Sequence, residues 1–128
     1  MKRLYVSLGL VLLLAALSGA HAWYLTRFTG QLNDLLSQAQ EQVEREDWEQ
    51  AARFTRRAQE QWMANNSYLH VTLRHTDTDA IQISFDETLA FLEADERQPA
   101  EYAASNLRLM TQLELLAEAE LPSLTNLL

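Results

Sequence analysis

The N-terminal part of the chain contains an uncharged segment of 22 residues, Leu4 to Leu25, which follows the basic pair Lys2 and Arg3. As an α-helix this segment measures roughly 33 Å at about 1.5 Å per residue, enough to cross a hydrocarbon core of about 30 Å. The sequence therefore predicts one membrane-spanning helix. It divides the chain into an anchor, residues 1–25, and one outer domain, residues 26–128.

Residues 1–22 also have the layout of a cleavable signal peptide, with a basic start, an apolar run and an Ala-x-Ala site that ends at Ala22. Cleavage there would release the rest of the chain as a secreted domain. Trp23 and Tyr24 follow directly, and such an aromatic pair suits the membrane–water interface of a retained helix. We therefore expect a retained anchor, with cleavage at Ala22 as the alternative.

Basic residues near the span predict its orientation. Lys2 and Arg3 precede the span, whereas Arg27 is the one base between the span and Glu44. Because positive charge accumulates on the cytoplasmic side, we expect a single-pass protein of the cell membrane with a cytoplasmic N-terminus. The domain at 26–128 is then extracytoplasmic.

The outer part of the chain is strongly acidic. Eight of the 10 basic residues and all 18 acidic residues follow the span, so residues 23–128 carry a formal charge of −10. This charge repels nucleic acid, which we do not expect as a partner. The absence of Cys removes disulfides, thiolate catalysis and cysteine metal ligands.

Apolar residues beyond the span recur at gaps of three and four, the spacing of one helix face. The first such stripe reaches Val43, and no Pro separates it from the span, so we expect one continuous helix. A second stripe runs from Trp48 to Trp62, and the small Ala51 within it permits close helix approach. Asp47 suits the N-terminal turn of this second helix, and the short connection predicts an antiparallel hairpin.

Residues 68–85 allow two interpretations. Alternation of apolar and polar residues is typical of a β-hairpin, whereas helical spacing links Leu69 to Leu73 and Ile81 to Phe85. Because a lone hairpin is only marginally stable and no third strand is visible, we expect a helix.

The last predicted helix begins at Pro99, a residue favoured at the first helical position, and ends at Leu121–Pro122. It runs through the apolar residues Tyr102, Ala103, Leu107, Met110, Leu113, Leu116 and Ala117. The patterns together predict an all-α fold: an N-terminal transmembrane helix followed by an antiparallel helical bundle of about four helices in two helical hairpins.

Chemical motifs are sparse. His75 and Asp79 would share a helix face, a spacing compatible with two ligands of one divalent metal. Two ligands do not complete a site, and capping of a helix start explains the run from Thr76 to Asp79 better. No nucleophile elbow, glycine-rich phosphate loop or zinc-protease motif occurs. We therefore expect no enzyme activity, catalytic residue, cofactor or small-molecule substrate.

Four motifs follow one another along the chain: Glu46-Asp47-Trp48-x-x-Ala51, Trp62, His75-x-Asp77-x-Asp79-x-Ile81 and Ser123-Leu124-x-Asn126-Leu127-Leu128. With these motifs the chain resembles the domain of unknown function 4363 family. The resemblance implies a small, single-pass, membrane-anchored helical protein of sporulating Gram-positive bacteria, with an uncleaved anchor and no established activity. We assign structural or interaction roles to Trp48, Ala51, Trp62, His75, Asp79 and Asn126.

The sequence favours one of two classes of function. An anchored helical domain without catalytic motifs favours an interaction or accessory module for another envelope or membrane protein. The alternative is an extracytoplasmic sensor or solute-binding domain, linked to a metal through His75 and Asp79, and secreted if the chain is cleaved at Ala22.

Overall fold

The computed structural model describes residues 1–65 and 75–127, without the side chains of His75 and of residues 120–127. The described residues form four helices and no strand: α1 (Lys2–Glu44), α2 (Trp48–Ala64), α4 (His75–Glu93) and α5 (Pro99–Leu127). The all-α prediction is therefore confirmed. Helix α4 also confirms the helical interpretation of residues 75–85, whereas the helix expected at 68–74 lies outside the described residues.

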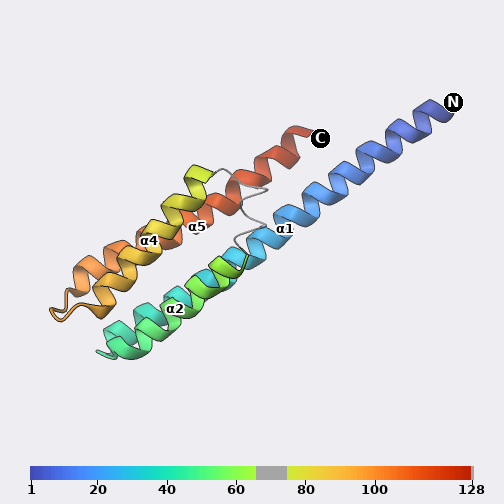
Figure 1. Cartoon of the computed structure of the whole chain (residues 1–128). Coiled ribbons are helices and arrows are strands. Elements are labelled where there is room, and N and C mark those ends of the chain that lie inside the picture. Colours follow the sequence, from blue (N-terminus) through green and yellow to red (C-terminus); the bar gives the residue numbers. More distant parts are fainter. Residues whose placement is uncertain (66–74, 128) are drawn as a thin grey trace.

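The helices form an antiparallel bundle in the cyclic order α1, α2, α4, α5 (Figure 1). Helix α1 packs against α2 and α5, and α4 packs against the same two helices from the other side. Successive helices run in opposite directions, so α1–α2 and α4–α5 are the two predicted hairpins (Figure 1).

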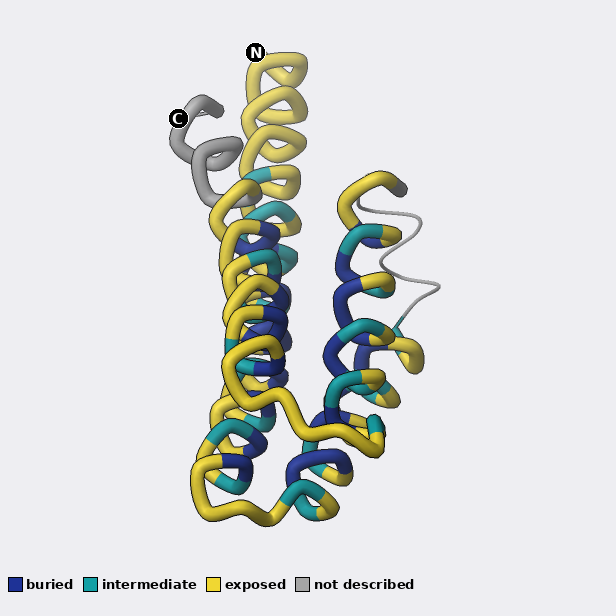
Figure 2. Tube along the Cα trace, turned by 90° about the vertical axis from the view of Figure 1, so that its left-hand side faces the viewer, coloured by how far each residue is buried: buried dark blue, intermediate teal, exposed yellow. Residues whose placement is uncertain are grey.

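Helix α1 is a single unbroken helix of 43 residues. Its N-terminal half extends beyond the bundle, and every residue up to Leu14 is exposed (Figures 1 and 2). From Ala22 onward, the residues of α1 that face the other helices are buried. Among the described residues, α1 is the one helix long and apolar enough to cross a membrane. Gly30 does not interrupt it, because a glycine costs only about 1 kcal/mol in a helix whose other face is packed.

A three-residue turn, Arg45 to Asp47, connects α1 to α2. Glu46 adopts a left-handed conformation with φ of 64°. Asp47 is the N-cap of α2, and its side chain accepts a hydrogen bond from the main-chain N–H of Gln50 at 3.1 Å. The carboxylate thus satisfies a helix N–H that has no partner within the helix, as expected for this position.

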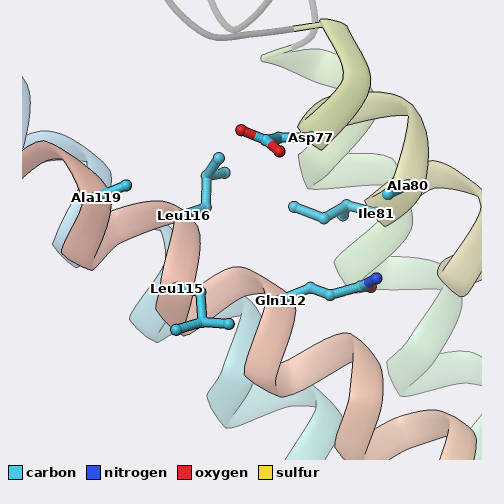
Figure 3. Close-up of a pocket in the computed structure, with 7 residues that line it drawn as sticks. All are labelled: Asp77, Ala80, Ile81, Gln112, Leu115, Leu116 and Ala119. Atoms are coloured by element: carbon cyan, nitrogen blue, oxygen red, sulfur yellow. The ribbon is translucent and has the colours of Figure 1, made fainter.

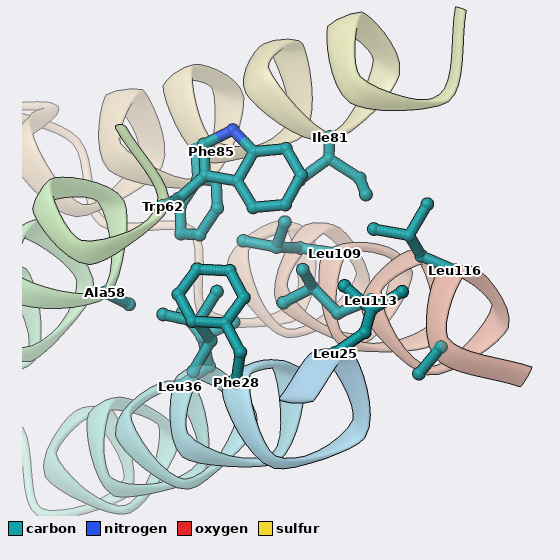
Figure 4. Packing of buried hydrophobic residues seen from close by; sticks show 12 residues of the cluster. Leu25, Phe28, Leu36, Ala58, Trp62, Ile81, Phe85, Leu109, Leu113 and Leu116 are labelled. Carbon is teal, nitrogen blue, oxygen red and sulfur yellow. The ribbon is translucent and has the colours of Figure 1, made fainter. Parts of the chain in front are cut away.

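The buried residues form two clusters. The proximal cluster lies toward the exposed half of α1 and is centred on Trp62, whose ring lies 6.4 Å from that of Phe28 and 6.3 Å from that of Phe85 (Figure 4). The distal cluster lies toward the α1–α2 turn, where the rings of Trp48 and Tyr102 pack edge to face with their centroids 6.0 Å apart. Aromatic side chains from α1, α2, α4 and α5 therefore join all four helices.

The end of α5 differs from the sequence-based expectation. The helix continues through Pro122 to Leu127, so the prediction that Leu121–Pro122 ends it is wrong. A proline removes a single main-chain hydrogen bond and crowds one preceding carbonyl. Close to a helix end this local loss does not require the following residues to leave the helix.

Candidate interaction surface

Helix α5 turns a polar residue inward and the leucine beside it outward. Asn106 is 2% exposed, whereas Leu107 is 65% exposed. Leu107 is thus one of the apolar residues that indicate the helix, but it does not belong to the buried face. The buried face of α5 includes Tyr102, Asn106, Leu109, Leu113 and Leu116. Their gaps of four, three, four and three fit one helix face. Apolar patterning alone selects Leu107 because an amide interrupts the true stripe.

Two amide side chains form hydrogen bonds between α5 and α1. Asn106 donates from Nδ2 to the main-chain carbonyl of Leu36 at 3.1 Å, and Asn33 donates from Nδ2 to the carbonyl of Met110 at 3.3 Å. The Oδ1 atoms of both asparagines are buried and have no hydrogen-bond partner in the described part of the chain. A buried oxygen without a hydrogen bond lowers the free energy of unfolding by about 1–3 kcal/mol. The presence of two such oxygens therefore indicates a role in specific packing or in function.

A groove of about 380 Å³ opens beside Asn106 between α1 and α5. It is lined by Ser37, Gln40, Glu41, Glu44, Ala103, Asn106, Leu107 and Met110. The α1 wall is polar and carries two exposed carboxylates, Glu41 and Glu44, neither of which pairs with a base among the described residues. The α5 wall is mainly apolar. The groove therefore combines an acidic rim with an apolar side.

An exposed stripe without charged residues continues from this groove along the outward face of α5. It consists of Ala100, Ala104, Leu107, Thr111 and Leu115, which we call the α5 outer stripe. Their gaps of four, three, four and four place them on one helix face. Leu107 and Leu115 are 65% and 57% exposed. Two large apolar side chains on one exposed helix face form a surface suited to protein contact.

Further polar groups lie inside the bundle behind the groove. The hydroxyl groups of Thr88 and Ser105 form a buried hydrogen bond of 2.8 Å between α4 and α5. The Tyr102 hydroxyl is buried without a hydrogen-bond partner among the described residues. Burial raises the pKa of Tyr102 well above its ordinary value of 10.0, and the Thr55 side chain lowers it in part. Thr55 itself donates to the carbonyl of Ala51, at 3.0 Å.

Three of the residues assigned structural or interaction roles pack between helices. Trp62 and Ala51 are almost fully buried, at 1% and 0% exposed. Trp48 is half-buried, and the Arg97 guanidinium lies 5.0 Å from its ring centroid. None of these three lines the groove between α1 and α5. Asn126 belongs to α5, and its side chain lies outside the described side chains.

His75 and Asp79 both lie in α4, one turn apart, and the side chain of His75 is not among those described. Within the described residues, no group of three or more His, Asp and Glu could hold a metal ion. The neighbouring Asp77 faces a pocket of about 310 Å³ (Figure 3). Its other lining residues are Ala80, Ile81, Gln112, Leu115, Leu116 and Ala119. One carboxylate beside mainly apolar walls offers few metal ligands, and the metal-linked function stays a prediction.

Comparison with known proteins places the chain in a family. A family model described as a domain of unknown function (DUF4363) matches residues 20–127. This range starts where α1 enters the bundle and includes α2, α4 and α5. No curated protein and no solved structure matches the chain. Because the family model covers most of the sequence, the family resemblance is confirmed, and the chain belongs to the DUF4363 family.

Proposed function

We propose that this protein is a membrane-tethered interaction module, whose extracytoplasmic bundle binds another membrane or envelope protein through the α5 outer stripe and the acidic groove beside it. The observation that carries the proposal is the burial of the polar Asn106 while the neighbouring apolar Leu107 is exposed on the surface. The proposal assigns binding, and no catalysis, to this surface.

The exposed half of α1 supports the tether. This half contains an 18-residue stretch that is apolar enough to cross a membrane and that is not buried within the bundle. An apolar surface of this length in water would be strongly unfavourable, whereas a bilayer accommodates it. Because the proposed span and the first helix of the bundle are parts of the one unbroken helix α1, the tether would hold the bundle by a fixed end. The basic residues Lys2 and Arg3 favour a cytoplasmic N-terminus.

The two walls of the groove indicate the chemistry of the partner. An amphipathic helix can place an apolar face on Leu107 and Leu115, in the manner of helix-in-groove recognition. Glu41 and Glu44 would then face basic residues at the edge of that helix. We therefore expect the partner segment to be a basic amphipathic helix, and its membrane or envelope location would bring it within reach of the tethered bundle.

Site-specific photocrosslinking tests the surface in intact membranes. A photoreactive phenylalanine analogue at Leu107 of the full chain is expected to form an adduct with a discrete partner. The same analogue at Ile83 is the matched control, because Ile83 lies on α4 and is 64% exposed, nearly the same as Leu107. Equal adducts from both positions, or none from Leu107, would contradict the proposal.

Charge reversal tests the acidic rim. Glu41→Arg is expected to reduce the adduct from position 107 by about tenfold, since it replaces attraction with repulsion at the groove edge. Glu60→Arg on the exposed face of α2 makes the same charge change away from the groove and should leave the adduct unchanged. A partner that binds equally well to both variants would rule out the basic-helix assignment.

Mass measurement after cell fractionation tests the tether itself. A mature chain that begins at Met1 in the membrane pellet would support it. A soluble chain that begins at Trp23 would contradict it and would favour the secreted binding domain instead.

A further inference from the structure

A second pocket, of about 470 Å³, lies between α1 and α2 where the exposed half of α1 meets the bundle. Its lining consists of Trp23, Tyr24, Arg27, Phe28, Gln31, Gln61 and Asn65. Trp23, Arg27 and Gln31 follow one another at intervals of four on one face of α1. Gln61 of α2 and Asn65, the C-cap of that helix, are separated by the same interval. The polar groups of the pocket therefore come from α1 and from the C-terminal end of α2.

The pocket holds one cation and two further amide donors. The Arg27 guanidinium lies over the Trp23 ring, 5.4 Å from its centroid, and pairs with no carboxylate among the described residues. The side-chain amides of Gln31 and Gln61 make no hydrogen bond within the described part of the chain. An outer domain with a formal charge of −10 thus presents an unpaired arginine at this position.

The remaining polar lining is fixed by internal contacts. The Tyr24 hydroxyl donates to Asn65 Oδ1, and Asn65 Nδ2 donates to the main-chain carbonyl of Gln61 at 2.9 Å. The Tyr24 ring stacks on Phe28, with centroids 6.0 Å apart and planes inclined by 1°. These contacts join the C-terminal end of α2 to α1 and give the pocket a rigid aromatic wall.

The position of the pocket along α1 depends on the proposed membrane tether. From Leu4 to Ala22 the helix covers roughly 28 Å, close to the hydrocarbon thickness of about 30 Å. Trp23 then lies at the boundary of the hydrocarbon core, and Arg27 lies about 6 Å farther out. The headgroup layer is about 5–8 Å deep on each side, so the unpaired guanidinium lies at the depth of lipid phosphates.

We propose that this pocket binds the phosphodiester group of a phospholipid in the outer leaflet. The guanidinium of Arg27 supplies a charge-assisted hydrogen bond to a phosphate oxygen, and the amides of Gln31 and Gln61 donate to the remaining oxygens. Trp23 contacts the glycerol region, where an amphipathic ring is favourable. The bound lipid would hold the α1–α2 edge of the bundle against the membrane.

Lipid binding to the full-length chain in non-ionic detergent tests this site. Native mass spectrometry would compare phosphatidylcholine with digalactosyldiacylglycerol, because both headgroups are uncharged overall and only the first contains a phosphodiester. We expect the wild-type chain to retain phosphatidylcholine, and Arg27→Gln to weaken its binding by about tenfold or more. Arg53→Gln is the matched control, since Arg53 is exposed on α2 and pairs with Glu49.

Three outcomes would overturn the site. Equal retention of the two lipids would show that the phosphodiester is not recognised. Displacement of phosphatidylcholine by millimolar inorganic phosphate would identify a site for free anions. If wild type, Arg27→Gln and Arg53→Gln bind phosphatidylcholine with equal affinity, Arg27 does not contact the lipid.

Vesicle flotation separates a failure of this site from a failure of the tether. If the full chain floats with phosphatidylcholine vesicles but Arg27→Gln binds the lipid as wild type does, the tether stands and the pocket proposal is wrong. If the wild-type chain does not float, the tether is wrong, and the pocket loses its position in the headgroup layer.

Discussion

Asn106 of α5 donates a hydrogen bond from Nδ2 to the main-chain carbonyl of Leu36 in α1, at 3.1 Å, and its Oδ1 is buried without a partner among the described residues. This contact ties the rotation of α5 to the backbone of α1. With Asn106 inside, Leu107 has to lie outside, because adjacent residues differ by about 100° around a helix. One buried amide thus determines which side of α5 the partner would meet.

Asn106→Leu is expected to stabilise the bundle by about 1 kcal/mol and to raise its Tm by about 4 °C. The substitution removes a buried unpaired oxygen, and the Leu36 carbonyl keeps its main-chain hydrogen bond within α1. The neighbouring groove of about 380 Å³ gives room for the larger side chain. Thermal unfolding followed by circular dichroism measures the change. Asn106→Ala is the control and should destabilise through a cavity, and a lower Tm for Asn106→Leu would show that its hydrogen bond outweighs the unpaired oxygen.

The first hairpin could be predicted from the sequence because its signals are local. The apolar stripe of α1 reaches Val43 at gaps of three and four, and all of α2 follows from Trp48 and its small neighbours. Asp47, expected in the N-terminal turn of this helix, is its N-cap. Each of these features depends on residues within one or two turns of each other.

The arrangement of α5 could not be predicted in the same way. Its buried face includes Asn106, and the reason for that burial lies in α1, 70 residues away along the chain. Leu107 fits a helical stripe about as well as Asn106 does, so apolar spacing alone chooses the wrong side. The groove at Glu41 and the pocket at Arg27 each need two helices, and no single segment of the sequence contains them.

Tyr102 predicts a loss of stability at alkaline pH. Burial holds its pKa well above the ordinary value of 10.0, so the phenol stays protonated in the folded chain after it ionises in the unfolded chain. Its contribution to stability is therefore complete below pH 10 and falls as the pH rises further, by at most about 1.4 kcal/mol per pH unit. Urea unfolding at pH 9, 10 and 11 measures this slope.

Tyr102→Phe is expected to remove this part of the alkaline loss, because phenylalanine cannot ionise. At neutral pH the variant should match or exceed the stability of wild type, since the hydroxyl has no hydrogen-bond partner among the described residues. Tyr24→Phe serves as the comparison for a partly buried tyrosine. An unchanged slope between pH 10 and 11 in Tyr102→Phe would contradict this account.

Asp47→Ala should destabilise the bundle by about 1 kcal/mol, because it removes the acceptor for the Gln50 N–H at 3.1 Å. Asp47→Asn keeps a side-chain oxygen at the same position and should retain most of the stability. Chemical unfolding of both variants at pH 7 separates capping from charge. If Asp47→Asn and Asp47→Ala destabilise the bundle equally, the carboxylate stabilises it through its charge and not through the hydrogen bond.

Trp62→Ala should destabilise the bundle by about 3–5 kcal/mol, because the indole is almost fully buried and joins α1, α2 and α4 through Phe28 and Phe85. Trp48→Ala removes the same side chain from a half-buried position at the distal end, where the lost burial is smaller. Urea unfolding should give a clearly lower free energy of unfolding for Trp62→Ala than for Trp48→Ala. Circular dichroism follows the transition, because both variants lose a fluorophore. Equal losses would mean that the two clusters contribute alike, and that the proximal aromatic contacts do not dominate the stability of the core.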